Sequence, residues 1–332
     1  MAAESPIQPR SIDAYGFWQD SQGPSAPPTT SPNTKELESK WISVLDRWPQ
    51  ALKQKRKLKK LVRSGIPQSL RGRVWMTLAN VDQYRREGEF ERLQQQEPTP
   101  IFEVIDRDIH RCYPNHSMFS EANGDGQVSL RNILQAYAIY NPEVGYCQGM
   151  GFLVGMMLMH LQAEDAFWLL VASLDRYSQG YYTPTMSKLL SDANVFQSLL
   201  KTHSRRLWKH MNNQEVTPLM YMTQWFLTLY TTVLPWPTVL RIWDMFYMQG
   251  VKVLFRTGLA IMRILEPSLL KSPTTADLVT LLLHLPPERF GPDTIVEQSL
   301  KISIKSKSLE AMRKASSKSA LSEARSSQPS PS

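Results

Sequence analysis

Apolar residues recur along most of this chain at spacings of three and four, the periodicity of helices with one buried face. Polar residues, glycine or proline follow each periodic stretch, so each has the length of a single helix. Runs of alternating apolar and polar residues joined by hairpin turns do not occur. The pattern predicts an all-α fold of non-repeated helices. Candidate helices cover residues 71–80, 101–112, 128–139, 146–161, 164–177, 217–233, 237–247 and 252–266.

A basic segment precedes this body. Four apolar residues from Trp41 to Leu52, spaced four, three and four apart, predict a helix over residues 35–63 with a bend near Pro49. The helix ends in residues 53–63, which carry seven Lys or Arg and no acid. Cations at the end of a helix interact favourably with its dipole.

The two ends of the chain differ in composition from the body. Residues 1–34 are rich in Pro, Ser and Thr, and residues 301–332 are rich in Ser, Lys and Ala, so disorder is expected in both. One aromatic group, Tyr15-Gly16-Phe17-Trp18, is expected to dock on the body or on a partner. The expected organisation is a single domain over residues 64–300, with its motifs between about 65 and 250, after a helical lead-in over 35–63.

The formal net charge of +8 lies almost entirely in the flanks. A nearly neutral body argues against a nucleic-acid surface, whereas basic flanks permit contact with an anionic membrane. The two cysteines fit neither a zinc site nor a disulfide framework. With no apolar signal core and no run long enough to cross a bilayer, we expect a cytoplasmic protein that is peripheral at membranes at most.

The first candidate for chemistry is an Arg-bearing helix. Ile105, Asp108 and Arg111 lie at i, i+3 and i+6, along one side of a helix. Asp108 would then brace Arg111 in the last turn before Pro114, while Ile105 packs beneath. Taken alone, the motif is explained more simply by a surface ion pair worth about a few tenths of a kcal/mol.

The second candidate is Gln148 in the run Gly145-Tyr146-Cys147-Gln148-Gly149-Met150. A loop with Asn-Pro and Gly leads into an apolar helix, so Gln148 is expected in the first turn, where backbone N–H groups are free. A carboxamide there can offer a donor and an acceptor to water and a phosphate oxygen. A glutamine that satisfies local backbone groups is the simpler explanation of this motif alone.

Two further motifs indicate structure rather than chemistry. Each motif places a tryptophan near a charged residue: Trp75 with Arg71, and Trp243 with Asp244. We expect the tryptophans to be buried and the charged groups to be satisfied by hydrogen bonds. The histidines have no metal-ligand spacing, and no phosphate-binding G-x-x-x-x-G-K-[ST] loop occurs. We therefore expect neither metal nor cofactor on this chain. A guanidinium and a water-orienting carboxamide suit phosphoryl transfer on a nucleotide that a partner holds.

In their order, these motifs resemble the TBC domain of Rab GTPase-activating proteins. The resemblance covers about residues 64–300, and residues 221–226 and 234–236 resemble the subgroup that includes carabin. The family-like motifs are S-G-I-P-x-x-x-R-x-x-x-W, I-x-x-D-x-x-R, G-Y-x-Q-G-M and R-I-W-D-x-F.

The resemblance implies an activator of a Rab GTPase in its GTP form, acting in vesicle trafficking, and not an enzyme with its own substrate. Arg111 would be the arginine finger, and Gln148 the glutamine finger that replaces the GTPase's own Gln in positioning water. Asp108 would hold Arg111, and Tyr146 would seat the Gln loop against the GTPase switch region. The partner GTPase would hold Mg²⁺ and GTP.

Gly151 departs from the family pattern, because many members carry Asn at this position. The departure bears on the hydrogen bonds around the Gln loop and hence on the choice of Rab. Two other classes of function remain open: a TBC-fold scaffold or effector without catalytic stimulation, and a membrane or cytoskeletal adaptor that works through the basic flanks. The presence of Arg111 and Gln148 favours the activator.

One motif in the C-terminal tail does not belong to this activity. Arg313-Lys314-Ala315-Ser316 has the form of a target for a kinase that selects basic residues before serine. A phosphate on Ser316 would remove about 1.5–2 charges from the tail and weaken its attraction to an anionic membrane.

Overall fold

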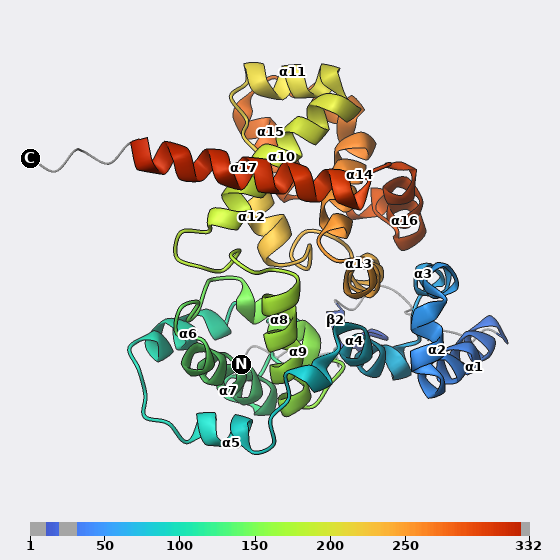
Figure 1. The fold of residues 1–332 in the computed structure, drawn as a ribbon, viewed down its shortest axis with the longest axis vertical. Coiled ribbons are helices and arrows are strands. Elements are labelled where there is room, and N and C mark those ends of the chain that lie inside the picture. The colour runs from blue at the N-terminus through green and yellow to red at the C-terminus, as the bar shows by residue number, and fades with distance from the viewer. Residues whose placement is uncertain (1–10, 20–31, 327–332) are drawn as a thin grey trace, which may run out of the picture.

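The computed structural model describes residues 11–19 and 32–326 of the chain (Figure 1). Within them 17 α-helices form the fold, and the only strands are two of two residues each, which confirms the expected all-α class. None of these helices is long and apolar enough to cross a membrane.

The N-terminal half contains β1 (Ser11–Ile12), β2 (Trp18–Gln19), α1 (Pro32–Asp46), α2 (Trp48–Lys53), α3 (Lys55–Ser64), α4 (Arg71–Ala79), α5 (Glu89–Gln94), α6 (Ile101–Ile109), α7 (Asp125–Tyr140), α8 (Met150–Leu158) and α9 (Ala163–Arg176). The C-terminal half contains α10 (Ser187–His203), α11 (Arg205–Asn213), α12 (Leu219–Leu227), α13 (Trp236–Gln249), α14 (Lys252–Leu269), α15 (Thr275–Leu283), α16 (Pro292–Lys301) and α17 (Ser306–Ser326). Short 3₁₀ turns lie at Gln68–Leu70, Val81–Gln83 and Pro287–Arg289.

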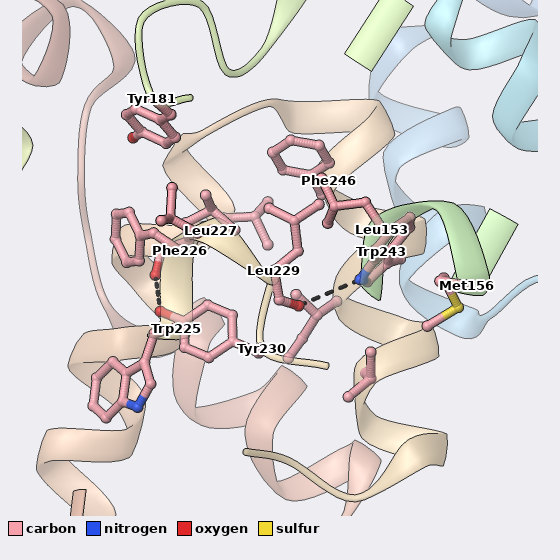
Figure 2. Packing of buried hydrophobic residues seen from close by; sticks show 14 of the residues in the cluster. Leu153, Met156, Tyr181, Trp225, Phe226, Leu227, Leu229, Tyr230, Trp243 and Phe246 are labelled. Atoms are coloured by element: carbon pink, nitrogen blue, oxygen red, sulfur yellow. Dashed lines mark hydrogen bonds between the residues drawn. The ribbon is translucent and has the colours of Figure 1, made fainter. Parts of the chain in front are cut away.

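Helix α13 joins the two halves of the molecule. It packs against α3 and α4 of the N-terminal half and against α14 and α16 of the C-terminal half (Figure 1). Around it the apolar faces of both halves merge into one buried cluster. Figure 2 shows Leu153 and Met156 of α8 beside Trp243 of α13, whose indole N–H donates to the carbonyl of Leu229 (3.3 Å). The packing fixes α8, and hence the start of α8, relative to the C-terminal half.

A buried ion pair ties the start of α4 to α13. The Nε atom of Arg71 lies 3.2 Å from Oδ1 of Asp244, and the Trp75 indole donates to the same oxygen (2.9 Å). Burial raises the pKa of Asp244, and the charge of Arg71 opposes that shift. Trp75 also packs against the ring of Trp243. These four motif residues therefore all make contacts inside the fold.

The basic lead-in consists of three helices instead of one bent helix. The chain breaks between α1 and α2 at Arg47, where Pro49 at the start of α2 favours a new helix, and again at Gln54, which the periodicity did not indicate. On α3 the apolar residues Leu58 and Val62 are buried, whereas most of its Lys and Arg residues are exposed.

Part of the N-terminal segment has a defined structure. Residues 11–19 form a hairpin whose Phe17 ring packs edge-on against His116 and Trp236, with ring centroids 4.9 Å apart in both cases. The aromatic group therefore docks on the body, one of the two places expected for it. Of the stretch 1–34 that was expected to be disordered, residues 32–34 belong to α1, and residues 1–10 and 20–31 lie outside the described residues.

The expectation of a C-terminal tail without regular structure needs correction. Helix α16 extends to Lys301, and α17 runs along α10 (Figure 1). Leu309 is buried, and Arg313 pairs with Asp192 of α10. A composition argument misses this helix because its contacts, among them the ion pair with Asp192, are made with residues far away in the sequence. Residues 327–332 lie outside the described part.

Candidate functional site

Arg111 lies in a tight turn directly after α6. The structure ends α6 at Ile109, two residues earlier than the last-turn position expected for Arg111. The backbone N–H of Arg111 still donates to the carbonyl of Asp108 (3.1 Å), and that of Cys112 donates to Ile109 (3.0 Å). These bonds span three residues, so the turn tightens and its side chains leave the helix face. The side chain of Arg111 is 64% exposed.

The carboxylate of Asp108 joins the two motifs that the sequence places 37 residues apart. Its Oδ1 lies 3.5 Å from Nε of Arg111. Its Oδ2 accepts a hydrogen bond of 2.7 Å from the hydroxyl of Tyr146, in the glutamine loop. Asp108 itself is only 13% exposed, and Ile105, one turn earlier, is fully buried below it. One carboxylate therefore holds both the Arg turn and the Gln loop.

Gln148 lies in the loop before α8, which corrects the expectation that it occupies the first turn. Gly149 is the N-cap with a φ of +105°, and α8 begins at Met150. Residues other than glycine rarely adopt this backbone conformation, so the chain turns at Gly149 and Gln148 stays outside the helix. Gln148 is exposed, and within the described part of the chain its carboxamide makes no hydrogen bond.

Burial determines the charge state of the groups around Asp108. It raises the pKa of the Tyr146 hydroxyl, and the hydrogen bond to Asp108 adds to the shift, so Tyr146 remains a donor. Burial also raises the pKa of Cys112 to about 12 and that of Cys147 above its ordinary value, with the charge of Asp108 adding in both cases. Neither thiol is a thiolate near neutral pH, so the site offers no cysteine nucleophile.

Cys112 explains the departure at Gly151. A Cβ atom on Gly151 would lie 2.5 Å from Sγ of Cys112, closer than atoms can approach. The thiol therefore occupies the space that a larger side chain at position 151 would need. The sequence analysis noted Gly151 but did not connect it with Cys112. The one available signal was that Cys112 directly follows the candidate Arg111.

The N-terminal hairpin supports the segment that follows Arg111. Ser117 donates its N–H to the carbonyl of Gly16 (2.9 Å), and Trp18 donates its N–H to that of Asn115 (2.9 Å). The ring of His116 lies 2.9 Å from the Tyr15 carbonyl. Sequence reasoning could not find these contacts, because they join residues about 100 positions apart.

Comparison with known proteins identifies the class of this chain. The family profile of the Rab-GTPase-TBC domain matches residues 68–270, more than half of the chain. The chain therefore belongs to the Rab-GTPase-TBC domain family.

Within that family it is similar to two mouse proteins. It is 41% identical to carabin over 260 residues, which cover 77% of this chain and 59% of carabin. It is 39% identical to TBC1 domain family member 10A over 260 residues, 76% of this chain and 52% of the relative. The chain spans about half the length of these curated relatives. The similarity agrees with the expected placement in the subgroup that includes carabin.

A solved structure shares the fold. The crystal structure of the Chlamydomonas flagellar RabGAP TBC domain superimposes with a TM-score of 0.69 at 26% identity. The match covers 88% of this chain and 99% of that structure. The all-α architecture is therefore the TBC fold over most of the described residues.

Proposed function

We propose that this chain accelerates GTP hydrolysis by a Rab-family GTPase in its GTP form, and that it supplies Arg111 and Gln148 in trans. The observation that carries the proposal is the double contact of Asp108 with Arg111 and with Tyr146 of the Gln148 loop. The turn that carries Arg111 and the loop that carries Gln148 are therefore anchored on one carboxylate. Membership of the Rab-GTPase-TBC domain family supports the same activity.

Arg111 has the properties that an arginine finger requires. GTP hydrolysis passes through a loose transition state with charge spread over the phosphoryl oxygens, and an inserted guanidinium increases the rate by roughly 10³–10⁵ in comparable systems. The contact with Asp108 is open to solvent on the side of Arg111, so it contributes about 0–1 kcal/mol. It orients Arg111 while leaving most of the guanidinium edge open to a phosphate.

Gln148 has the properties that a water-positioning residue requires. Its exposed carboxamide is a donor and an acceptor, so it can hold the attacking water against a GTPase backbone group. The Tyr146–Asp108 hydrogen bond before it and the start of α8 at Met150 after it restrict the loop on both sides. A restricted loop loses less entropy when the complex forms.

The GTPase holds the nucleotide and Mg²⁺ in this scheme. Metal and P-loop bind and partly neutralise the phosphates, and the present chain adds the positive charge and the oriented water that the isolated GTPase lacks. On α6 the exposed Val104 lies one turn before Asp108, on the same side of the helix. This apolar residue beside the finger is suited to packing against the GTPase.

Single-turnover GTP hydrolysis across a panel of purified, GTP-loaded Rab proteins tests the proposal. We expect acceleration of at least one Rab, lost in Arg111→Ala. Arg107→Ala is the matched control, because Arg107 is an exposed arginine of α6 paired with Glu103 and away from the loop. A Rab that binds in its GTP form but hydrolyses at its intrinsic rate throughout would contradict the proposal and would support the scaffold alternative.

A further inference from the structure

Helix α17 is held on the body by the buried Leu309 and, further along, by an ion pair with α10. The guanidinium of Arg313 contacts both carboxylate oxygens of Asp192 at 2.8–3.0 Å, and Asp192 is fully buried. The hydroxyl of Tyr181 donates to Oδ2 of the same carboxylate, and Lys188 lies 3.7 Å from its Oδ1. A fully buried carboxylate needs such partners, because an unpaired charge is costly in a low-dielectric interior.

The serines that follow complete this contact. Ser316 donates its hydroxyl to the backbone carbonyl of Ser191 (2.9 Å), and Ser317 shares a hydrogen bond of 3.0 Å with the hydroxyl of Ser191. Beyond Met312 the described side chains of α17 that reach α10 are polar. The segment from Arg313 to Ser317 is therefore held on α10 by polar contacts. A segment with little buried apolar surface opens more readily than the packed core.

Arg313 and Ser316 are also the ends of the Arg-Lys-Ala-Ser motif. They lie at i and i+3, so both face α10 and are covered while the helix is docked. Kinases bind the residues around the target serine in an extended conformation. The motif is therefore accessible only when this part of α17 is released from α10. We propose that Ser316 is a phosphorylation site and that its phosphate holds α17 in the released state.

The transfer is ordinary phosphoryl chemistry. The Ser316 Oγ attacks the γ-phosphorus of ATP held by the kinase, forming the Oγ–P bond as the bond to the β,γ-bridging oxygen breaks. ADP leaves with the electron pair of the broken bond, and the hydroxyl proton passes to the kinase base. The product carries about 1.5–2 negative charges and no longer has the hydroxyl hydrogen that Ser316 donated.

Those charges oppose redocking in two ways. The phosphate oxygens would face the carbonyl of Ser191 and lie near the buried carboxylate of Asp192, the next residue along α10. The phosphate also competes with Asp192 for Arg313, three residues away on the same helix. Modification of the open form therefore shifts the population toward it.

The test uses the whole chain, ATP and a purified kinase that selects basic residues two and three positions before serine. We expect mass spectrometry to place phosphate on Ser316, with Ser317→Ala modified normally and Ser316→Ala not modified at this site. Hydrogen exchange of the modified protein should increase about tenfold or more over residues 308–317 of α17, and also around Asp192 of α10. Arg313→Ala should raise exchange in the same places without any phosphate.

Two results would overturn the proposal. One is a whole chain left unmodified at Ser316 under conditions in which a peptide of residues 306–326 is modified. The other is complete modification with unchanged exchange in α10 and α17. Both readouts are independent of any GTPase, so neither result bears on the proposed activity.

Discussion

Asp108 is the residue on which the site depends, because its two oxygens serve two different motifs. The i, i+3, i+6 spacing on α6 was sufficient to predict that Asp108 would brace Arg111. The contact with Tyr146 could only be implied by family resemblance, since no local pattern joins positions 38 residues apart. Gln148 was predicted as a candidate in the first turn of a helix from residue 146. The helix begins four residues later, at Met150, because the chain turns at Gly149, whose φ was not apparent from the sequence.

Replacing the guanidinium tests the role of Arg111. We expect Arg111→Lys to lose stimulation almost as completely as Arg111→Ala, roughly 10³-fold or more, because an ammonium lacks the planar fork. Thermal unfolding should barely change, since the Arg111 side chain is 64% exposed. Single-turnover rates and melting curves of both variants check this, and near-normal stimulation by the lysine variant would refute the finger role.

The contact of Gly151 with Cys112 predicts a double-mutant effect. Gly151→Ala places a methyl group 2.5 Å from the Cys112 sulfur and should destabilise the fold by about 1–3 kcal/mol. Adding Cys112→Ala removes that sulfur and should recover most of the loss, which chemical denaturation of the four proteins measures. Strictly additive effects would show that the two residues are not coupled.

At the scale of elements, the sequence predicted what local periodicity encodes. The eight candidate helices correspond to α4, α6, α7, α8, α9, α12, α13 and α14, whereas α5, α10, α11, α15 and α16 were not among them. The lead-in was predicted as one helix bent near Pro49 and consists of three helices. The sequence analysis did not predict the 11–19 hairpin or α17, because each is held by contacts with residues more than 95 positions away, such as His116 and Asp192. A composition argument evaluates a segment alone, whereas these two are stabilised by the body on which they dock.

The hairpin is expected to support the segment behind Arg111. Phe17→Ala removes the ring that packs on His116 and Trp236, so hydrogen exchange over residues 113–120 should increase. Stimulation of the GTPase should fall, with the larger change in kcat, because the finger would be held less firmly. Ile12→Ala, at an exposed position of the same hairpin, is the control. Unchanged hydrogen exchange over residues 113–120 would show that the hairpin does not support the segment that follows Arg111.

At the scale of the whole molecule, positive charge gathers on one side of α13. Burial lowers the pKa of Lys252 on α14, and the charges of Arg256, Lys59 and Arg63 lower it further, so these cations from α3 and α14 lie close together. Arg313 in the C-terminal tail, by contrast, is paired with the carboxylate of Asp192. Attraction to an anionic membrane should therefore depend on α3 more than on the tail.

Vesicle sedimentation measures that attraction. We expect weak, salt-sensitive binding to vesicles that contain anionic lipid, since each cation near such a surface contributes about 1 kcal/mol. Neutralising the exposed Lys55, Lys57 and Lys60 to Gln should reduce the bound fraction strongly. The matched triple change of Lys271, Lys305 and Lys307, which are also exposed, should reduce it little. A bound fraction that does not depend on anionic lipid would contradict the proposed membrane contact. It would have no bearing on the catalytic proposal.

The central claim is that Gln148 replaces the GTPase's own glutamine, and one measurement tests it directly. Single-turnover hydrolysis is followed for the preferred Rab and for the same Rab with its catalytic Gln changed to Leu. If the claim holds, the wild-type chain stimulates both, and Gln148→Ala stimulates neither while still binding the GTP form. A Gln→Leu Rab that binds the wild-type chain but shows no acceleration would contradict the account.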